Sequence, residues 1–341
     1  MIADATRKLI RREDLSAEES RLAVEAIMSG GVSPSLVAAF LTAMRMKGET
    51  PEEVYGAAQT MRDRVTRIAH NQPVLLDNCG TGGDGAGTFN ISTTAAFVLA
   101  GAGVAVGKHG NRCISSRSGS ADVLQALGVR IDLTPVQVSR CIDDIGIGFM
   151  FAPLLHPAMK AVAPVRRELG FRTLFNLLGP LTNPAFATHQ VVGVFDPAYT
   201  EIVAEAAASL GGKRAYAVHN EIGIDELATT GLNRVSIFED GELRTFTIDP
   251  TEFGFGVCRP QDLAGGAAHD NAAITLDVLG GIAGPALDTV VMNAALGFVA
   301  VELVSSFREG LSLAKNTIKD GRALRKLNEF VDYTCGLQHV A

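Results

Sequence analysis

Glycine is unusually frequent in one part of the chain, beside residues that suit phosphate binding. The sequence has 36 glycines, above the roughly 7% of an average protein. Eleven lie between Gly80 and Gly128, and five of these lie within Gly80 to Gly87. The exposed N–H groups of such a loop can face phosphate oxygens. The run Asn-Ile-Ser-Thr at 90–93 is expected to cap an apolar helix beginning near Thr94, whose N-terminus is a second anion site. Taken alone, a glycine-rich turn followed by an ordinary cap explains the pattern equally well.

A second segment adds positive charge. An expected strand at Val104–Val106 leads into residues 107–122, which contain Lys108, Arg112, Arg117 and four serines. Lysine supplies a point charge and serine a short donor, which suits a pyrophosphate group. A solvated basic loop is the alternative, although such loops rarely carry so many small hydroxyl residues beside glycine. The two segments together predict a ligand with two phosphate groups.

The segment Gly80–Gly85 also fits the GxGxxG pattern of dinucleotide-binding proteins. Its context argues against that interpretation, because the loop continues to Gly87 and Asp84 would lie among the N–H groups meant for pyrophosphate. Lys108 stands where the pattern requires an acidic residue at the end of a strand. A P-loop is excluded because no GK[ST] follows. A nicotinamide-dependent dehydrogenase is therefore a weak alternative.

Five blocks of the sequence closely resemble the anthranilate phosphoribosyltransferase family. They are GTGGDGAGTFNIST, KHGNRCISSRSGSAD, FAPLLHPAM, PVRRELGFRTLFNLLGPLTNP and GIDEL. The match as a whole runs in order from the first helices to the final helical section. The resemblance implies transfer of phosphoribose from 5-phosphoribosyl 1-pyrophosphate (PRPP) to the amino group of anthranilate in tryptophan biosynthesis, with Mg²⁺ and release of pyrophosphate. It also implies a homodimer formed through a small helical domain.

The resemblance assigns roles residue by residue. It implies that PRPP is contacted by Gly80, Gly83, Asp84, Thr88, Asn90, Ile91, Ser92, Thr93, Lys108, Ser116 and Ser120. It implies that anthranilate is contacted by Gly80, His109, Asn111 and Arg166. Mg²⁺ is expected at Ser92, Asp225 and Glu226, and the catalytic residues are expected to be Lys108, Asp225 and Glu226.

These residue types suit the chemistry. The amine of anthranilate is unprotonated at neutral pH, so a strong general base is dispensable, and catalysis should rest on positioning and charge neutralisation. Adjacent carboxylates can serve Mg²⁺, and an arginine suits a benzoate-type acceptor. Because helical neighbours point in different directions, one of Arg166 and Arg167 is expected to be a surface residue. His156 is expected to form the wall of the site rather than to be catalytic.

The match has departures near the acidic pair. Asn220 stands where the family usually has a small residue, and Glu221 adds a carboxylate. Cys79 precedes the glycine loop where a small aliphatic residue is common. The alternatives are therefore a phosphoribosyltransferase with another aromatic acceptor, or a nucleoside phosphorylase. The phosphorylase signature places a lysine just before an STGG loop, whereas here Lys108 follows the glycine loop.

The elements expected to position these residues fall into two domains. Residues 1–70 are expected to form helices that begin after Ser16, Ser33 and Thr50, each followed by capping signals. Residues 71–341 are expected to form a larger α/β domain, and a segment near 163–190 is expected to add to the helical domain. Four apolar runs alternate with helical stretches, and a final helical section is expected from Asn271 to about Tyr333. The apolar runs are at Val74–Leu76, Val104–Val106, Gln190–Val194 and Ala215–Val218. The expected fold is α/β with a central, mostly parallel sheet of the nucleoside phosphorylase/phosphoribosyltransferase type.

Composition excludes several classes of protein. The net charge of −7 argues against broad nucleic-acid binding. The five cysteines form no CxxC, and the histidines show no metal-ligand spacing. No apolar run is long enough to span a membrane, and the N-terminus does not resemble a secretory signal. A cytoplasmic enzyme without nucleic-acid or membrane partners is expected.

Overall fold

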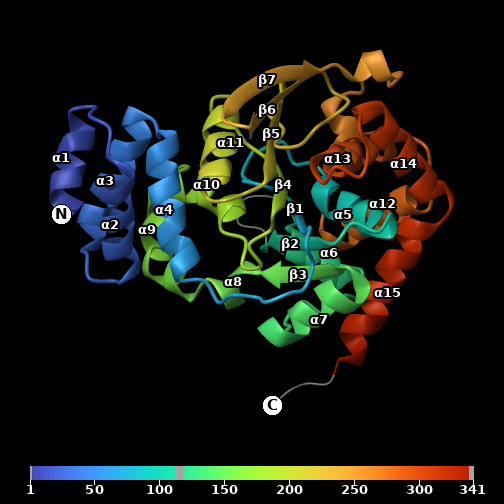
Figure 1. Ribbon diagram of the computed structural model, residues 1–341, viewed down its shortest axis with the longest axis horizontal. Coiled ribbons are helices and arrows are strands. Elements are labelled where there is room, and N and C mark those ends of the chain that lie inside the picture. The colour runs from blue at the N-terminus through green and yellow to red at the C-terminus, as the bar shows by residue number, and fades with distance from the viewer. Residues whose placement is uncertain (1, 113–117, 338–341) are drawn as a thin grey trace.

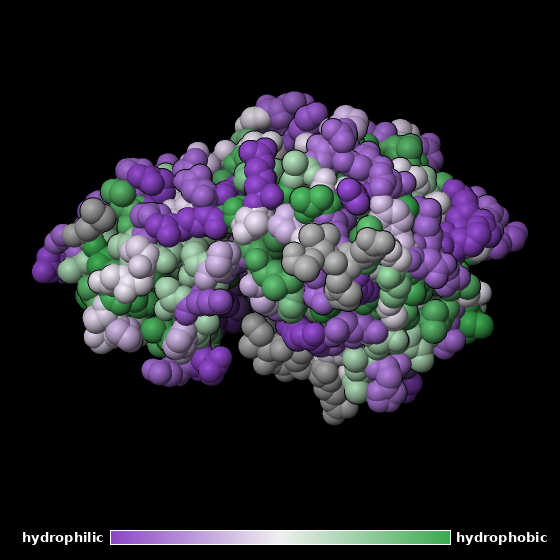
Figure 2. All heavy atoms as spheres, turned by 90° about the horizontal axis from the view of Figure 1, so that it is seen from below, coloured by the Kyte–Doolittle hydropathy of each residue, from purple (hydrophilic) through white to green (hydrophobic). Residues whose placement is uncertain are grey.

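The computed structural model describes residues 2–112 and 118–337, which form a helical lobe beside a larger body built around one sheet (Figure 1). The lobe contains α1 (Ile2–Ile10), α2 (Ala17–Met28), α3 (Pro34–Lys47) and α4 (Pro51–Asp63). Figure 2 shows the surface indented between this lobe and the body. None of the helices in the described ranges combines the length and apolar character that crossing a bilayer requires.

The helices of the lobe begin where capping signals predict. Ser16 and Thr50 each accept a hydrogen bond from the N–H of a glutamate three residues later, and that glutamate bonds back to the cap. These two capping boxes satisfy N–H groups that would otherwise have no partner. Proline at the first position of α3 and of α4 fits the φ of a first helical turn.

The body contains one seven-stranded sheet in the order β3-β2-β1-β4-β5-β6-β7. The strands are β1 (Leu76–Gly80), β2 (Val106–Gly110), β3 (Ile147–Phe151), β4 (His189–Gly193), β5 (Arg214–Asn220), β6 (Asn233–Glu239) and β7 (Glu242–Ile248). Strands β1 to β5 pair in parallel, and β6 pairs antiparallel with both β5 and β7. The expected mostly parallel α/β sheet is therefore confirmed.

Helices cover both faces of the sheet. On β4, Val191 belongs to one apolar core and Val192 to the other, as the alternation of side chains along a strand requires. The first core contains α5 (Ile91–Gly101), α6 (Ser120–Ala126), α7 (Pro135–Ile145), α12 (Ala268–Leu279), α13 (Pro285–Ala300), α14 (Phe307–Lys319) and α15 (Arg322–Gly336). The second core joins the lobe to α9 (Ala163–Leu169), α10 (Leu174–Leu181) and α11 (Tyr199–Ser209). The short α8 (Ala152–Leu155) follows β3.

Candidate active site

The glycine loop follows β1 directly. After Gly80, the backbone adopts positive φ at Gly82 (68°), Gly83 (69°), Gly85 (76°) and Gly87 (66°). Side chains other than glycine rarely adopt this conformation, and glycine adopts it at little cost. The loop can therefore turn its N–H groups toward one side, as an anion-binding loop requires.

Asp225 lies directly beneath this loop. Its Oδ2 accepts a hydrogen bond from the N–H of Gly82 at 2.7 Å. A Cβ at Gly80 would lie 2.4 Å from Asp225 Oδ2, and a Cβ at Gly193 would lie 1.5 Å from the Asp225 carbonyl oxygen. Both strand ends must therefore be glycine for Asp225 to reach its position. Gly193 is a site residue that the sequence interpretation missed, since its partner is distant in the chain.

Glu226 binds the N-terminus of α5. Its Oε1 accepts the Ser92 N–H at 3.1 Å, so a carboxylate lies at the positive end of the helix. The expectation for the cap was wrong in detail, because α5 begins at Ile91 rather than near Thr94, and the Asn90 side chain makes no capping bond. Asn90 instead donates to the Ser118 carbonyl at 3.2 Å and accepts from Asn271 at 2.8 Å. A charged carboxylate is the stronger acceptor at this helix end.

The side chains of the remaining expected residues of α5 are buried. Ile91 and Thr93 are 1% exposed, so their side chains belong to the core. The Ile91 N–H donates to the Phe89 carbonyl oxygen at 2.8 Å. Thr88 pairs with Ala264 in an isolated bridge, which places the segment after residue 260 against the loop. The sequence interpretation did not identify that segment.

The carboxylates around the loop are strongly perturbed. Burial, Asp84 and Glu226 raise the pKa of Asp225 well above its usual range, and burial raises the pKa of Glu226 to about 7 against the opposing effect of Lys108. Such a cluster favours a cation or protons. Within the described part of the chain, no three such side chains form a ready metal-binding group. This donor set fits Mg²⁺, which takes one or two carboxylates and completes its shell with waters and substrate phosphates.

Lys108 lies on β2, where its side chain is buried against β1. Only 4% of the residue is exposed, and its Nζ donates to the carbonyl oxygen of Asn78. Burial raises the pKa of both Asp77 and Glu226, and the positive charge of Lys108 offsets part of that rise. Lys108 therefore lies among the carboxylates of the site, as the sequence interpretation requires.

Two histidines meet on the other face of β2. His109 Nδ1 lies 3.2 Å from the Gly179 carbonyl oxygen, and its Nε2 lies 3.2 Å from His156 Nε2. Burial lowers the pKa of His109 to about 3 and that of His156 to about 4. Both rings are neutral at physiological pH and too weakly basic to take a proton there. This arrangement supports the expectation that His156 forms a wall of the site.

Arg166 lies on α9 and faces α10. It is half-buried and its guanidinium lies 5.8 Å from the ring centroid of Phe175, whereas Arg167 is exposed. Within residues 2–112 and 118–337, no carboxylate lies within ion-pair distance of Arg166. Phe175 and Gly179 are four residues apart on α10, so they share a helix face. A Cβ at Gly179 would meet no heavy atom within 4 Å, so this face borders open space near His109.

The basic segment is only partly described. Ser116 lies outside the described residues. Asn111 is exposed, and its carbonyl oxygen accepts from Ser120 Oγ at 3.3 Å. Ser120 is the first residue of α6, and Asp122 rather than Ser120 binds the N–H of the cap Gly119.

The two departures near the acidic pair are explained by the β5–β6 connection. Asn220 accepts from Thr230 Oγ1 at 2.8 Å and donates to Asn233 Oδ1 at 3.0 Å. Glu221 accepts from the Leu232 N–H at 2.9 Å. Both side chains therefore hold the turn to β6, and their hydrogen bonds lead away from the glycine loop.

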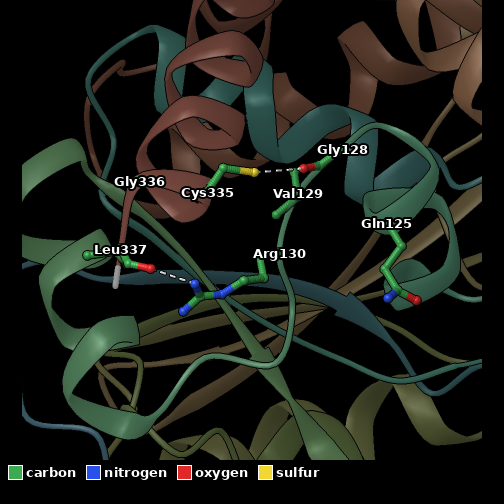
Figure 3. Close-up of a pocket in the computed structure, with 7 residues that line it drawn as sticks. All are labelled: Gln125, Gly128, Val129, Arg130, Cys335, Gly336 and Leu337. Atoms are coloured by element: carbon green, nitrogen blue, oxygen red, sulfur yellow. Dashed lines mark hydrogen bonds between the residues drawn. The ribbon is translucent and has the colours of Figure 1, made fainter. Parts of the chain in front are cut away.

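A separate hollow lies at the C-terminal end of α15 (Figure 3). Its walls include Arg130, which donates to the Leu337 carbonyl at 2.6 Å, and Cys335, whose thiol lies 3.4 Å from the Gly128 carbonyl. None of the expected site residues lines this hollow.

Comparison with known proteins identifies similar chains over the whole length. Residues 3–65 match the helical bundle domain of a glycosyl transferase family, and residues 72–324 match its a/b domain. The anthranilate phosphoribosyltransferase of Moorella thermoacetica is 51% identical over 324 residues, covering 95% of this chain and 96% of that protein. The crystal structure of the Thermus thermophilus enzyme has a TM-score of 0.92 and 44% identity, covering 98% of this chain and 100% of that one. The Saccharomyces cerevisiae enzyme in complex with PRPP and Mg has a TM-score of 0.89 and 30% identity, with 98% of both chains covered.

Proposed function

Because the chain belongs to the anthranilate phosphoribosyltransferase family, we propose that the glycine loop, the acidic pair and Arg166 carry out the reaction of that family. The protein transfers the 5-phosphoribosyl group from PRPP to the amino group of anthranilate, in tryptophan biosynthesis, with Mg²⁺ as cofactor. We propose below which residues of this chain bind PRPP, Mg²⁺ and anthranilate.

PRPP is assigned to the side of the sheet where the glycine loop and α5 meet. The observation that carries this assignment is that Asp225 binds the Gly82 N–H and Glu226 binds the Ser92 N–H, at 2.7 and 3.1 Å. Each of the two adjacent carboxylates thus bonds to one of the two anion-binding backbone segments. Ser92, Asp225 and Glu226 would hold Mg²⁺, which when bound supplies positive charge to the departing pyrophosphate.

Lys108 supplies a fixed positive charge beside the same carboxylates. Departure of pyrophosphate leaves an oxocarbenium-like centre, so the developing negative charge on the leaving group must be stabilised. A buried ammonium is more effective at this than an exposed one, because water screens it less. We assign Lys108 to the phosphate groups of PRPP, and we assign Gly80, Gly83, Asp84 and Thr88 to contacts with PRPP.

Anthranilate is assigned to the face of α10 that carries Phe175 and Gly179. Arg166 has the planar fork of donors that suits a carboxylate, and it has no carboxylate of the described chain to compete with. His109 and Asn111 approach from β2 and the loop after it. The neutral histidines suit an amine that needs positioning but no strong base.

We also propose that residues 1–70 and 71–341 are the two domains, with the segment near 163–190 adding to the helical one, and that the helical domain forms a homodimer. The second apolar core, which unites the lobe with α9 and α10, supports this division. Ile10 and Met46 of the lobe are 69% and 75% exposed, which suits an interface between copies. The described cysteines are unpaired, in keeping with the reducing cytoplasm that we propose as its compartment.

The direct test follows the fluorescence of anthranilate in the presence of PRPP and Mg²⁺. The signal should fall with time and should stop falling when a chelator is added. Phosphate with a pyrimidine nucleoside is the matched control and should give no turnover. Stable anthranilate fluorescence at millimolar substrate would contradict the proposal.

A further inference from the structure

Strands β1 and β2 are neighbours in the sheet, yet they pair at only one position. Leu76 pairs with Val106, whereas β1 pairs with β4, and β2 with β3, over five positions each. The strands that lead to the glycine loop and to Lys108 therefore separate toward their C-terminal ends. The backbone groups that face this gap are buried and need other partners.

Side chains provide those partners. Three of them reach into the gap and bond to the backbone groups that a regular ladder would have paired. These contacts are Asp77 Oδ1 with the His109 N–H at 3.2 Å, Asn183 Nδ2 with the Gly107 carbonyl at 2.9 Å, and Lys108 Nζ with the Asn78 carbonyl. The separation of the strands is thus maintained by specific hydrogen bonds.

Asp77 and Asn183 also bind each other. Asn183 Nδ2 donates to Asp77 Oδ2 at 2.7 Å, and the two residues are 1% and 0% exposed. Asn183 follows α10, and its Oδ1 accepts the Ala185 N–H at 2.9 Å. The carboxylate of Asp77 therefore joins β1 to β2 and to the segment that follows α10. Helix α10 carries the residues that we assign to anthranilate.

Lys108 and His109 extend from opposite faces of β2. Lys108 reaches the carbonyl of Asn78 beside the carboxylates, and His109 reaches Gly179 on α10. The position of β2 relative to β1 thus sets how far the phosphate side lies from the acceptor side. A shift of about 1 Å in such a distance can cost on the order of a hundredfold in rate.

We propose that Asp77 and Asn183 are positioning residues for phosphoribosyl transfer, which hold β2 at the separation from β1 that aligns the two substrates. This proposal rests on the proposed function, because it uses the assignment of PRPP and anthranilate to the two faces of β2. It predicts a loss in kcat with little change in the KM of either substrate. A purely structural pair would change the melting temperature alone.

The test exchanges the two side chains. Asp77→Asn places an amide opposite the amide of Asn183, and Asn183→Asp places two carboxylates together. Each single variant should lower kcat by about tenfold or more, with the KM for PRPP and for anthranilate within threefold of wild type. The double variant restores the hydrogen bond between positions 77 and 183 but not the donor to the Gly107 carbonyl. It should therefore recover part of the lost kcat, at least threefold over the better single variant.

Two further variants keep the test decisive. Asn183→Ala preserves every charge and should also lower kcat, even where the charge-changing single variants fold poorly. Ile318→Ala, on the buried face of α14, should lower the melting temperature and leave kcat unchanged. The proposal is overturned if Asn183→Ala retains kcat within twofold, or if the exchanged double variant is no better than the single ones. Failure of the proposed function is distinct, since wild type itself would then show no turnover.

Discussion

Arg166 and Arg167 are adjacent, but only Arg166 is half-buried against an aromatic ring of α10. Arg166→Ala should raise the KM for anthranilate at least tenfold, because a hydrogen bond to a charged group contributes about 1.5–3 kcal/mol. The KM for PRPP should stay within twofold. Steady-state kinetics with each substrate varied in turn provide the measurement.

Arg167→Ala is the matched control and should resemble wild type. An equal loss for both substrates in Arg166→Ala, or a larger effect of Arg167→Ala, would contradict the assignment of Arg166 to the acceptor.

His156 makes the stability of the protein depend on pH. Its pKa falls from the ordinary 6.5 to about 4 because it is buried, so the unfolded state binds more protons between these pH values. The contribution of His156 is complete above pH 6.5 and is lost as the pH falls through 4, by on the order of 2–3 kcal/mol in total. His156→Gln should reduce the difference in unfolding free energy between pH 7.5 and pH 5, measured with urea.

His269 provides the comparison, since its side chain is 83% exposed. His269→Gln is the matched substitution at an exposed position. If His156→Gln has the same pH dependence as wild type, the buried neutral histidine is not its source.

At the residue scale, local patterns in the sequence predicted the glycine loop, but they placed Lys108 in a basic loop after a strand, whereas it lies buried within β2. The partner of α5 could not be predicted in this way, because Ser92 and Glu226 are 134 positions apart. The same holds for Gly193, which is required by a carbonyl of Asp225. Asn90 looked like a cap by its type, and only the folded chain shows that a carboxylate takes that place.

At the scale of elements, α4 is tied to two helices of the body through Arg62. Its guanidinium donates to the Leu181 carbonyl at 2.8 Å and to the Leu210 carbonyl at 2.7 Å, at the C-terminal ends of α10 and α11. Helix C-termini attract cations, and burial lowers the pKa of Arg62 to about 10. Arg62 therefore fixes the helix that carries Phe175 and Gly179.

Arg62→Lys should weaken this attachment, because one ammonium on a flexible stem cannot reproduce the rigid fork. The expected result is a rise of about threefold to tenfold in the KM for anthranilate, with the KM for PRPP unchanged, and a loss of about 1–3 kcal/mol in unfolding free energy. Steady-state kinetics and urea unfolding measure the two effects.

Arg64→Lys is the control from the same helix end, since Arg64 pairs with Glu25 within the lobe. It should change neither KM. A rise in the PRPP and anthranilate KM values together in Arg62→Lys would show that Arg62 does not act through α10.

The apolar runs predicted where the strands lie only approximately. Strands β1 and β2 extend further toward the C-terminus than the runs that predicted them, for a physical reason. The runs at Val74–Leu76 and Val104–Val106 end where β1 and β2 begin, because these strands continue into Asp77 and Lys108. A buried polar residue in a strand is compatible with folding only when it has partners, and those partners come from distant segments. The antiparallel β6 and β7 were not identified, since β7 is exposed along most of its length.

For the whole molecule, each of the two apolar cores supports one of the two proposed substrate sites. The core that contains α5 supports the glycine loop, and the core shared with the lobe supports Arg166 and α10. The sheet, and β2 in particular, lies between them. The sequence predicts a helical domain, a larger α/β domain and a contribution to the helical domain from the segment near 163–190. In the structure, α9 and α10 share the second apolar core with the lobe.

The central claim is that Asp225 and Glu226 support the Mg²⁺-dependent binding of PRPP and take no part in the binding of anthranilate. The most direct measurement is calorimetric titration of PRPP and of anthranilate, with and without Mg²⁺, into wild type and into the Asp225→Asn/Glu226→Gln variant. Mg²⁺ should tighten PRPP binding to wild type, and this effect should be lost in the variant. Anthranilate affinity should stay within threefold. A variant that retains the full effect of Mg²⁺ on PRPP binding would contradict the account.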